Sequence, residues 1–177
     1  LECNFPLRIE NYVTLPDTGG AGKHRGGNAL RISYGFLEDG EISVHDDRWL
    51  TYPWGVNGGL PGQRSRKILV HADGSEELLY SKRDRIKVLA GDILHFDTWG
   101  GGGWGKPYER DASRVAKDVD RGLVTIDGAR RYGVVMRDGE SFDEAATEAL
   151  RTEMRSADAG SEEIFNRGGT IEQLKAL

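Results

Sequence analysis

Histidine and carboxylate residues stand two positions apart at two places in the sequence, as His45 with Asp47 and as His95 with Asp97. Residues two apart on a β-strand face the same side, so each pair presents an imidazole and a carboxylate together. Such donors suit a metal such as Zn²⁺ or Mn²⁺. Nothing in the sequence brings the two pairs together, and histidines beside carboxylates at strand ends are usually hydrogen-bonded surface groups. We therefore predict no metal site in this chain.

A glycine-rich stretch from Gly19 to Gly27, GGAGKHRGG, is the second chemical candidate, because glycine amides and a lysine together can hold phosphate. A Walker loop requires glycine five positions before the glycine of its Gly-Lys pair and serine or threonine after the lysine. Those places hold Asp17 and His24. We therefore interpret the stretch as a strand-connecting turn, which Arg25 stabilises by donating to backbone carbonyls or to a carboxylate.

Four consecutive glycines create a formal match to the dinucleotide motif G-x-G-x-x-G at Gly100, Gly102 and Gly105. A glycine run produces this match by chance, and Pro107 interrupts the place where the motif requires a helix. The preferred interpretation is a close-packing turn at the edge of a sheet. Catalysis by cysteine or by a serine triad lacks support, since Cys3 lies at a terminus and no G-x-S-x-G pattern occurs.

An aromatic loop over residues 46–62 combines large apolar side chains with proline and glycine. Trp49, Tyr52, Trp54 and Leu60 carry too much apolar area for a solvated loop, since burying one such side chain is worth about 1.5–3 kcal/mol. One interpretation is a cover over the open end of a β-sandwich, and the other is a subunit interface. We expect the loop to be exposed in the isolated chain and buried in an assembled complex, with Trp54 as the anchor.

The elements that must position these residues are predicted by short or alternating apolar runs between glycines and prolines in residues 1–100. Turn signals at Gly40, Gly74 and Gly91 separate several runs, at places where glycine adopts a positive φ cheaply. The predicted strands cover residues 7–13, 29–37, 41–44, 67–70, 77–81, 85–89 and 92–97. Strands of this length and spacing favour a sandwich or barrel over alternating strands and helices.

Helical spacing follows the glycine run, over residues 111–121 and 141–155. Ser141, with Glu144 three positions later, is the expected N-cap of the second helix. A short helix within 124–131, a brief strand over 132–137, a peripheral tail from residue 157 and a last helix from Thr170 complete the prediction. The fold class is α+β, with a β-rich sandwich or barrel-like domain over 1–105. A helical C-terminal region over 106–177 is expected to pack on that domain or on a partner.

Composition limits the classes of function. The chain has 177 residues, with 24 Lys or Arg against 29 Asp or Glu and a formal net charge of -5, which argues against a strongly basic nucleic-acid binder. No apolar run approaches the roughly 20 residues that a membrane helix needs. A single cysteine cannot form an intrachain disulfide, and we see no leader pattern. We therefore expect a cytoplasmic protein with neither nucleic acid nor membrane as a partner.

Three stretches, in this order, resemble the hydantoinase B/oxoprolinase family. They are FPLRIENYVTLPDTGGAGKHRGG, YPWGVNGGLPGQRSR and GDILHFDTWGGGGWGKPYERDASRVAKDVDRGLVTIDGARRYGVV. The resemblance covers roughly residues 5 to 136, and the tail 138–177 has no counterpart that we can assign. Relatives in that family include the large subunits of acetone and acetophenone carboxylases and the B-type chain of caprolactamase. The resemblance implies that the chain is a fragment, a separately encoded piece or a proteolytic product of the C-terminal part of a longer subunit.

The resemblance also implies a function, namely part of an ATP-dependent cyclic-amide hydrolase of the hydantoinase or 5-oxoprolinase type, or of an ATP-dependent ketone carboxylase complex. An A-type subunit would use ATP to phosphorylate a lactam, hydantoin or ketone oxygen, and the B-type subunit would complete hydrolysis or carboxylation. ATP and a divalent metal are expected in the full complex, and none on this chain alone. The expected partners are the remainder of the B-type subunit and the ATP-binding A-type subunit.

Two other classes of function stay open: a non-catalytic assembly or interface module, and a small binding protein whose own pocket gathers polar groups. Catalytic residues are unknown. The candidate structural or interface residues are Gly19, Gly20, Gly22, Arg25, Gly26, Gly27, Trp54, Gly58, Gly59, Gly101, Gly102 and Gly103.

Overall fold

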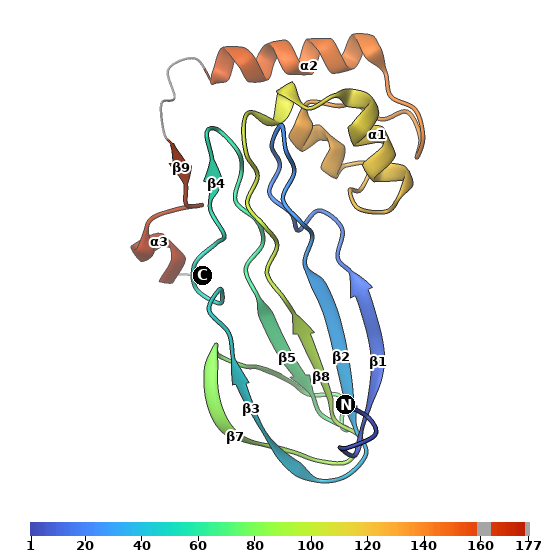
Figure 1. Ribbon diagram of the computed structural model, residues 1–177, viewed down its shortest axis with the longest axis vertical. Helices are drawn as coiled ribbons and strands as arrows, with labels where there is room; N and C mark the ends of the chain where they lie inside the picture. The colour runs from blue at the N-terminus through green and yellow to red at the C-terminus, as the bar shows by residue number, and fades with distance from the viewer. Residues whose placement is uncertain (159–163, 176–177) are drawn as a thin grey trace.

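The computed structural model describes residues 1–158 and 164–175. Its strands are β1 (Leu7–Thr14), β2 (Leu30–Phe36), β3 (Gly40–His45), β4 (Gly55–Val56), β5 (Arg66–Val70), β6 (Glu76–Leu78), β7 (Lys82–Val88), β8 (Ile93–Asp97) and β9 (Phe165–Asn166). Its helices are η1 (Pro107–Glu109), α1 (Ala112–Asp120), η2 (Gly128–Tyr132), α2 (Glu144–Ala157) and α3 (Ile171–Lys175). The five-stranded sheet and the β3-β7 pair occupy one end of an elongated molecule, and α1 and α2 occupy the other (Figure 1). No helix in these described ranges is long and apolar enough to cross a membrane.

The strand region is an open antiparallel sandwich. One layer is a sheet with strand order β1-β2-β8-β5-β6, and the other is the β3-β7 pair. The alternating apolar residues of both layers meet in one core, which consists of Phe36, Val44, Leu69, Leu79, Ile86, Val88 and Leu94. This arrangement confirms the predicted α+β class and its sandwich form, and the sheets do not close into a barrel. Gly74 and Gly91 have the positive φ expected of turn residues, but Gly40 does not and begins β3.

A buried ion pair joins the two layers of the sandwich. Lys67 on β5 and Asp46, which directly follows β3, are paired, and both side chains are excluded from solvent. The hydroxyl of Ser65 donates to the other oxygen of Asp46 at 2.9 Å, and the ammonium of Lys67 lies 5.5 Å from the ring centroid of Phe96. Burial lowers the pKa of the Lys67 ammonium from 10.5 to about 8.

A second core lies beneath the helices. It contains Ala21, Val115, Val124, Ala129, Tyr132 and Val134, and Leu60 packs against it. Tyr132 is almost fully buried, which raises the pKa of its phenol to about 12. Ala21 and Leu60 come from the N-terminal side of residue 105, so the two predicted regions share this core. The division of the chain into domains at that residue stays a prediction.

The N-cap of α2 differs from the predicted one. Asp143, not Ser141, caps α2, because its carboxylate accepts from the amide of Ala146 at 2.9 Å. Ser141 is engaged elsewhere, since its amide and hydroxyl both donate to Asp138. Asp111 caps α1 in the same way, by accepting from the amide of Ser113.

Two other predicted segments differ from the structure. The short helix expected within 124–131 is the 3-10 helix η2, which ends at Tyr132 and is followed by Gly133 with a φ of 67°. The strand expected over 132–137 is wrong, because the turn at Gly133 diverts the backbone and Met136 forms only an isolated bridge with Phe142. Residues 159–163 and 176–177 of the predicted tail, including Gly160, lie outside the described residues. The last helix is α3, which begins one residue after Thr170.

Candidate functional site

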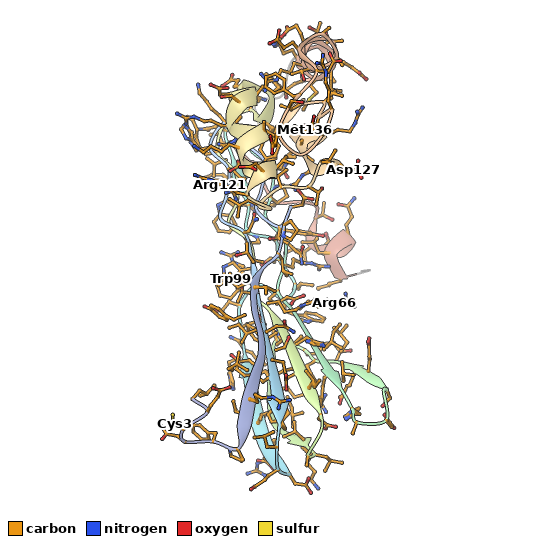
Figure 2. The ribbon with its side chains drawn as sticks, turned by 90° about the vertical axis from the view of Figure 1, so that its right-hand side faces the viewer. Cys3, Arg66, Trp99, Arg121, Asp127 and Met136 are labelled. Carbon is orange, nitrogen blue, oxygen red and sulfur yellow. The ribbon has the colours of Figure 1, made fainter. Side chains whose placement is uncertain are left out.

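Most of the predicted site residues lie in one place, between the sandwich and the helices. Three stretches meet there, residues 18–28, 53–63 and 99–105, which we call the glycine bundle. Figure 1 shows them as extended backbone that continues from the strands toward α1 and α2, and Figure 2 places Trp99 midway between Cys3 at one end and Arg121, Asp127 and Met136 at the other. Positive φ occurs in the bundle only at Asn57, Gly58 and Gly105. The stretch 18–28 connects the paired strands β1 and β2, as predicted, but no residue of 18–28 or 99–105 lies in a hydrogen-bonded turn.

Backbone hydrogen bonds connect the stretches of the bundle in more than one direction. The amide of Gly20 donates to Gly101 at 2.8 Å, that of Leu60 donates to Ala21 at 2.7 Å, and that of Gly103 donates to Leu60 at 2.9 Å. A strand in a flat sheet has hydrogen bonds only to the strand on either side of it, whereas these bonds connect each of the three stretches to the other two. Such an arrangement is typical of close-packed threefold extended helices, in which only glycine fits at the crowded positions.

The run of four glycines shows why side chains are excluded. A Cβ atom on Gly100 would lie 2.0 Å from the carbonyl oxygen of Thr18, and one on Gly103 would lie 2.2 Å from that of Ala21. A Cβ on Gly102 would point elsewhere, to 1.9 Å from the carbonyl oxygen of Trp54. Gly100 and Gly103, which are three apart, thus face one neighbouring stretch and Gly102 between them faces another, as is typical of a helix with three residues per turn. The run therefore lies in the interior of the bundle.

Other glycines of the predicted set have different roles. Gly19, Gly20, Gly22, Gly26 and Gly59 all have backbone atoms within 3.0 Å of where a Cβ would lie, so each permits a close approach of two backbones. Gly58 instead forms a turn with Asn57 in which both residues have positive φ. Gly27 is exposed and has open space around its Cβ direction, so its neighbours do not require glycine there.

Arg25 connects the bundle to α1. Its guanidinium donates to the carbonyl of Gly26 at 2.8 Å, to the side chain of Asn28 at 3.1 Å and to the carboxylate of Asp118 at 3.3 Å. Arg110 donates to the same carboxylate oxygen of Asp118 at 2.9 Å, and the side chains of all three charged residues are largely buried. Arg25 thus donates both to a backbone carbonyl and to a carboxylate, the two kinds of acceptor predicted for it.

Replacing Arg25 by lysine is expected to lower the free energy of unfolding by about 1–2 kcal/mol, because an ammonium on a flexible chain cannot reach all three acceptors at once. Chemical denaturation of the chain measures this loss. Arg114→Lys is the matched control, since Arg114 is exposed on α1 and its replacement should leave the midpoint unchanged. An Arg25→Lys chain as stable as the parent would contradict the proposed connection.

Part of the aromatic loop over residues 46–62 is hydrogen-bonded to the rest of this chain. The amide of Val56 donates to Gly103 at 2.9 Å, that of Leu60 to Ala21 at 2.7 Å and that of Gly62 to Pro53 at 2.9 Å. The expectation that the whole loop is exposed in the isolated chain is therefore wrong for residues 55–62, whose backbone belongs to the chain's own bundle. The side chain of Trp54 differs, because it stays 46% exposed.

Trp54 lies in an exposed apolar patch that we call the Trp54 patch, consisting of Trp54, Ile164 and Phe165. β4 and β9 pair antiparallel and bring the two segments together, with the rings of Trp54 and Phe165 6.4 Å apart. The guanidinium of Arg48 lies over the ring of Trp54, at 5.0 Å from its centroid. The patch combines an aromatic anchor with neighbours that hold it in place, which is typical of interface hot spots.

The two His-x-Asp pairs do not act as pairs. His45 contacts Asp84 at 3.0 Å while Asp47 pairs with Lys82. His95 bonds to Ser33 at 2.8 Å, and Asp97 forms a bidentate pair with Arg31. In residues 1–158 and 164–175 no group of three or more His, Cys, Asp or Glu side chains could hold a metal ion.

Phosphate binding by the glycine bundle does not fit its hydrogen bonding. The amides of Gly20, Lys23 and Gly26, which would have to point at a phosphate, donate instead to backbone carbonyls within the bundle. Nor does the bundle place a nucleophile beside a base.

The sequence of this chain matches a family model and two relatives of the same family. The family model of hydantoinase B/oxoprolinase matches residues 1–107. The beta subunit of caprolactamase from Pseudomonas jessenii is 36% identical over 157 residues, which are 85% of this chain and 27% of that one. The B-type chain of a putative D-/L-hydantoinase from Pseudomonas sp. (strain NS671) is 32% identical over 154 residues, 85% of this chain and 26% of that one.

Solved structures agree with the fold. The crystal structure of the ATP-dependent caprolactamase from Pseudomonas jessenii superposes with a TM-score of 0.70 at 34% identity, over 86% of this chain and 27% of the other. A nucleotide-free acetone carboxylase structure superposes with the same TM-score at 23% identity, over 89% and 26%, and that likeness concerns the fold alone. The chain thus spans about a quarter of the length of these caprolactamase and hydantoinase relatives.

Proposed function

Because this chain belongs to the hydantoinase B/oxoprolinase family, we propose that it forms the C-terminal portion, or a small subunit, of an ATP-dependent enzyme complex that hydrolyses cyclic amides or carboxylates a ketone. The observation that carries the proposal is the correspondence over 85% of this chain with two relatives, one from a caprolactamase and one from a hydantoinase. Within the proposal we favour hydrolysis of a cyclic amide, because these two relatives, a caprolactamase and a hydantoinase, both exceed 30% identity.

The glycine bundle defines what this part contributes. Its interior is closed to side chains and many of its amides donate to backbone carbonyls within the bundle, which favours a rigid structure over one that closes around a substrate. We assign it a supporting role, in which it holds the Trp54 patch and the helices at fixed positions. The chemistry would then take place on the rest of the assembly, and the ATP and divalent metal of the complex would be held by groups outside the described residues.

The partners follow from the same argument. The Trp54 patch is expected to contact the remainder of the B-type subunit or the ATP-binding A-type subunit. Native mass spectrometry of the complex, with identification of the chains that co-purify with this one, tests the proposal. Recovery of this chain together with an ATP-binding subunit supports it, and a stable assembly containing only copies of this chain contradicts it.

Truncating Trp54 is expected to weaken that assembly by about 2 kcal/mol or more, roughly thirtyfold in the dissociation constant, because a partly exposed tryptophan in a supported patch is the usual form of a hot spot. Tyr12→Ala is the matched control, since Tyr12 is 65% exposed on β1 and lies outside the patch. Equal dissociation constants for Trp54→Ala and the parent would remove the patch from the interface.

The isolated chain is expected to hydrolyse neither ATP nor a hydantoin, because the glycine amides that could hold phosphate are already bonded and no metal-binding cluster occurs in its described residues. A coupled ATPase assay and a chromatographic hydantoinase assay on the purified chain measure both activities. Turnover that a point substitution in this chain abolishes would place catalytic groups here and refute the supporting role.

The alternative is a purely non-catalytic assembly module. The interlocked backbone of the bundle and the exposed Trp54 patch favour it, since both features serve packing without chemistry. Omission of this chain from a reconstituted complex separates the two proposals. Loss of turnover from an assembly that stays intact supports a role in the reaction, whereas loss of the assembly itself supports the module.

A further inference from the structure

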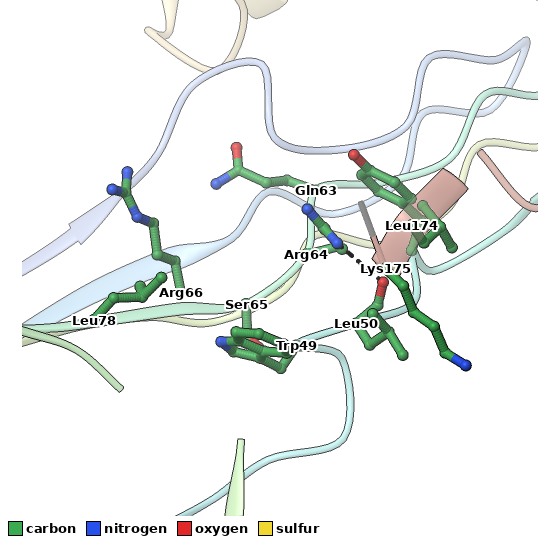
Figure 3. Close-up of a pocket in the computed structure, with 10 residues that line it drawn as sticks. Trp49, Leu50, Gln63, Arg64, Ser65, Arg66, Leu78, Leu174 and Lys175 are labelled. Atoms are coloured by element: carbon green, nitrogen blue, oxygen red, sulfur yellow. Dashed lines mark hydrogen bonds between the residues drawn. The ribbon is translucent and has the colours of Figure 1, made fainter. Parts of the chain in front are cut away.

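A pocket of about 410 Å³ lies between the aromatic loop, the segment leading into β5, and α3 (Figure 3). Trp49 and Tyr52 provide aromatic rings, Gln63 provides an amide, and Arg64, Arg66 and Lys175 provide three cations. The C-terminal wall is held in place because Gly168, with a φ of 76°, packs against the ring of Tyr52. The volume lies within the range of about 300–1,000 Å³ that is typical of small-molecule sites.

The charged side chains that line this pocket are all cationic. Among the described residues, its lining includes three cationic side chains and no carboxylate, although the chain as a whole has a net charge of -5. Figure 3 shows the guanidinium of Arg66 toward one end, Lys175 toward the other and Arg64 between them. A concave site of one charge sign attracts ions of the opposite sign. Its ligand is therefore expected to be an anion.

Arg64, the central cation, is held in position by two contacts. One nitrogen of Arg64 donates to the carbonyl of Leu50 at 3.1 Å, and its guanidinium lies 4.9 Å from the ring centroid of Tyr52. Trp49 is fixed in turn by Tyr80, with ring centroids 5.0 Å apart. A guanidinium presents five N–H donors, so Arg64 keeps free donors for a carboxylate or phosphate after these contacts. Fixed donors lose little conformational entropy on binding.

We propose that this pocket binds a small organic anion, in which a carboxylate or phosphate monoester is attached to a flat apolar body. The anionic group would receive hydrogen bonds from Arg64 and from Gln63 or a second cation, while the apolar body would lie against Trp49. Of the residues that line the site, Gln63 also belongs to the glycine bundle, and the existence of the site does not depend on the function proposed above.

Binding of benzoate and of phenyl phosphate to the 177-residue chain tests this site, with benzamide as the uncharged probe of the same shape. Calorimetry at low salt gives the dissociation constant, and the indole N–H resonance of Trp49, assigned with Trp49→Phe, gives the location. We expect one or both anions to bind saturably and to shift that resonance, and benzamide to bind at least about tenfold more weakly. Whichever anion binds more tightly identifies the preferred group.

Substitution then assigns the cations. Arg64→Gln is expected to weaken anion binding by about tenfold or more, and the exposed residues Arg66 and Lys175 give second variants, Arg66→Gln and Lys175→Gln, whose folding is not at risk. Arg114→Gln on α1 is the matched control and should leave binding unchanged.

Three results would overturn the proposal: no saturable binding of either anion, equal binding of benzamide, or equal losses in Arg64→Gln and Arg114→Gln. Binding of an acidic peptide but of neither small anion would also overturn it, and would identify a protein-docking groove instead.

Discussion

Replacing Gly26 by alanine is expected to lower the free energy of unfolding by about 3 kcal/mol or more, whereas the same change at the adjacent Gly27 is expected to leave it unchanged or to raise it by up to about 1 kcal/mol. A Cβ on Gly26 would lie 2.0 Å from the carbonyl oxygen of Gly101, which is backbone and cannot rotate away. A Cβ on Gly27 would meet nothing within 4 Å. Neither residue has a positive φ, so backbone strain does not separate them.

Urea denaturation of the two variants and the parent measures the difference. The loss at Gly26 should appear as a lower midpoint with an unchanged slope, since the unfolded states expose similar surface. If Gly26→Ala fails to fold, Gly59→Ala and Gly139→Ala extend the comparison, because a Cβ on Gly59 would lie 2.1 Å from the carbonyl oxygen of Gly103 and one on Gly139 would meet nothing. Equal midpoints for Gly26→Ala and Gly27→Ala would mean that the bundle is not close-packed as described.

The sandwich could be predicted because its signals are local. Alternating apolar residues locate β2, β5 and β8, and the turns at Gly74 and Gly91 separate strands where predicted. The helix cap could not be decided locally, since Ser141 and Asp143 are both good capping residues. The deciding contact is the bond between Ser141 and Asp138, which occupies the serine and leaves Asp143 to cap α2.

The glycine bundle was harder to predict, because the residue type alone does not distinguish a glycine at a turn from a glycine in a close-packed extended segment. The signal that could have separated them is spacing. Gly19 with Gly22, Gly59 with Gly62, and Gly100 with Gly103 are each three apart, the period of an extended threefold helix, in three distant stretches. Turns have no reason to share that period. The anion pocket had no comparable signal, since it depends on α3 reaching the aromatic loop across a long stretch of intervening sequence.

Replacing Lys67 by methionine is expected to lower the free energy of unfolding by about 3–5 kcal/mol, because it leaves the carboxylate of Asp46 buried without its counter-ion. Only the hydroxyl of Ser65 would still donate to that carboxylate. The double variant Lys67→Met with Asp46→Asn is expected to recover most of the loss, since replacing both members of a buried pair by neutral groups is often close to neutral. Lys82→Met is the control, because its pair with Asp47 is exposed and contributes about 0–1 kcal/mol.

Asp46→Asn alone gives a test with a defined pH dependence. It leaves Lys67 buried without a carboxylate, where burial lowers the pKa of the folded ammonium to about 8, against 10.5 in the unfolded chain. Between these two pKa values the unfolded chain binds more protons, so the stability of this variant should rise with pH across the window from about 8 to 10.5. The double variant, which has no ammonium at this position, should not show the rise. Denaturation midpoints of the two variants at about pH 7.5 and about pH 9.5 measure it, and parallel changes would mean that Lys67 is not the titrating group. The buried pair would then stabilise the contact between the two layers through packing rather than through charge.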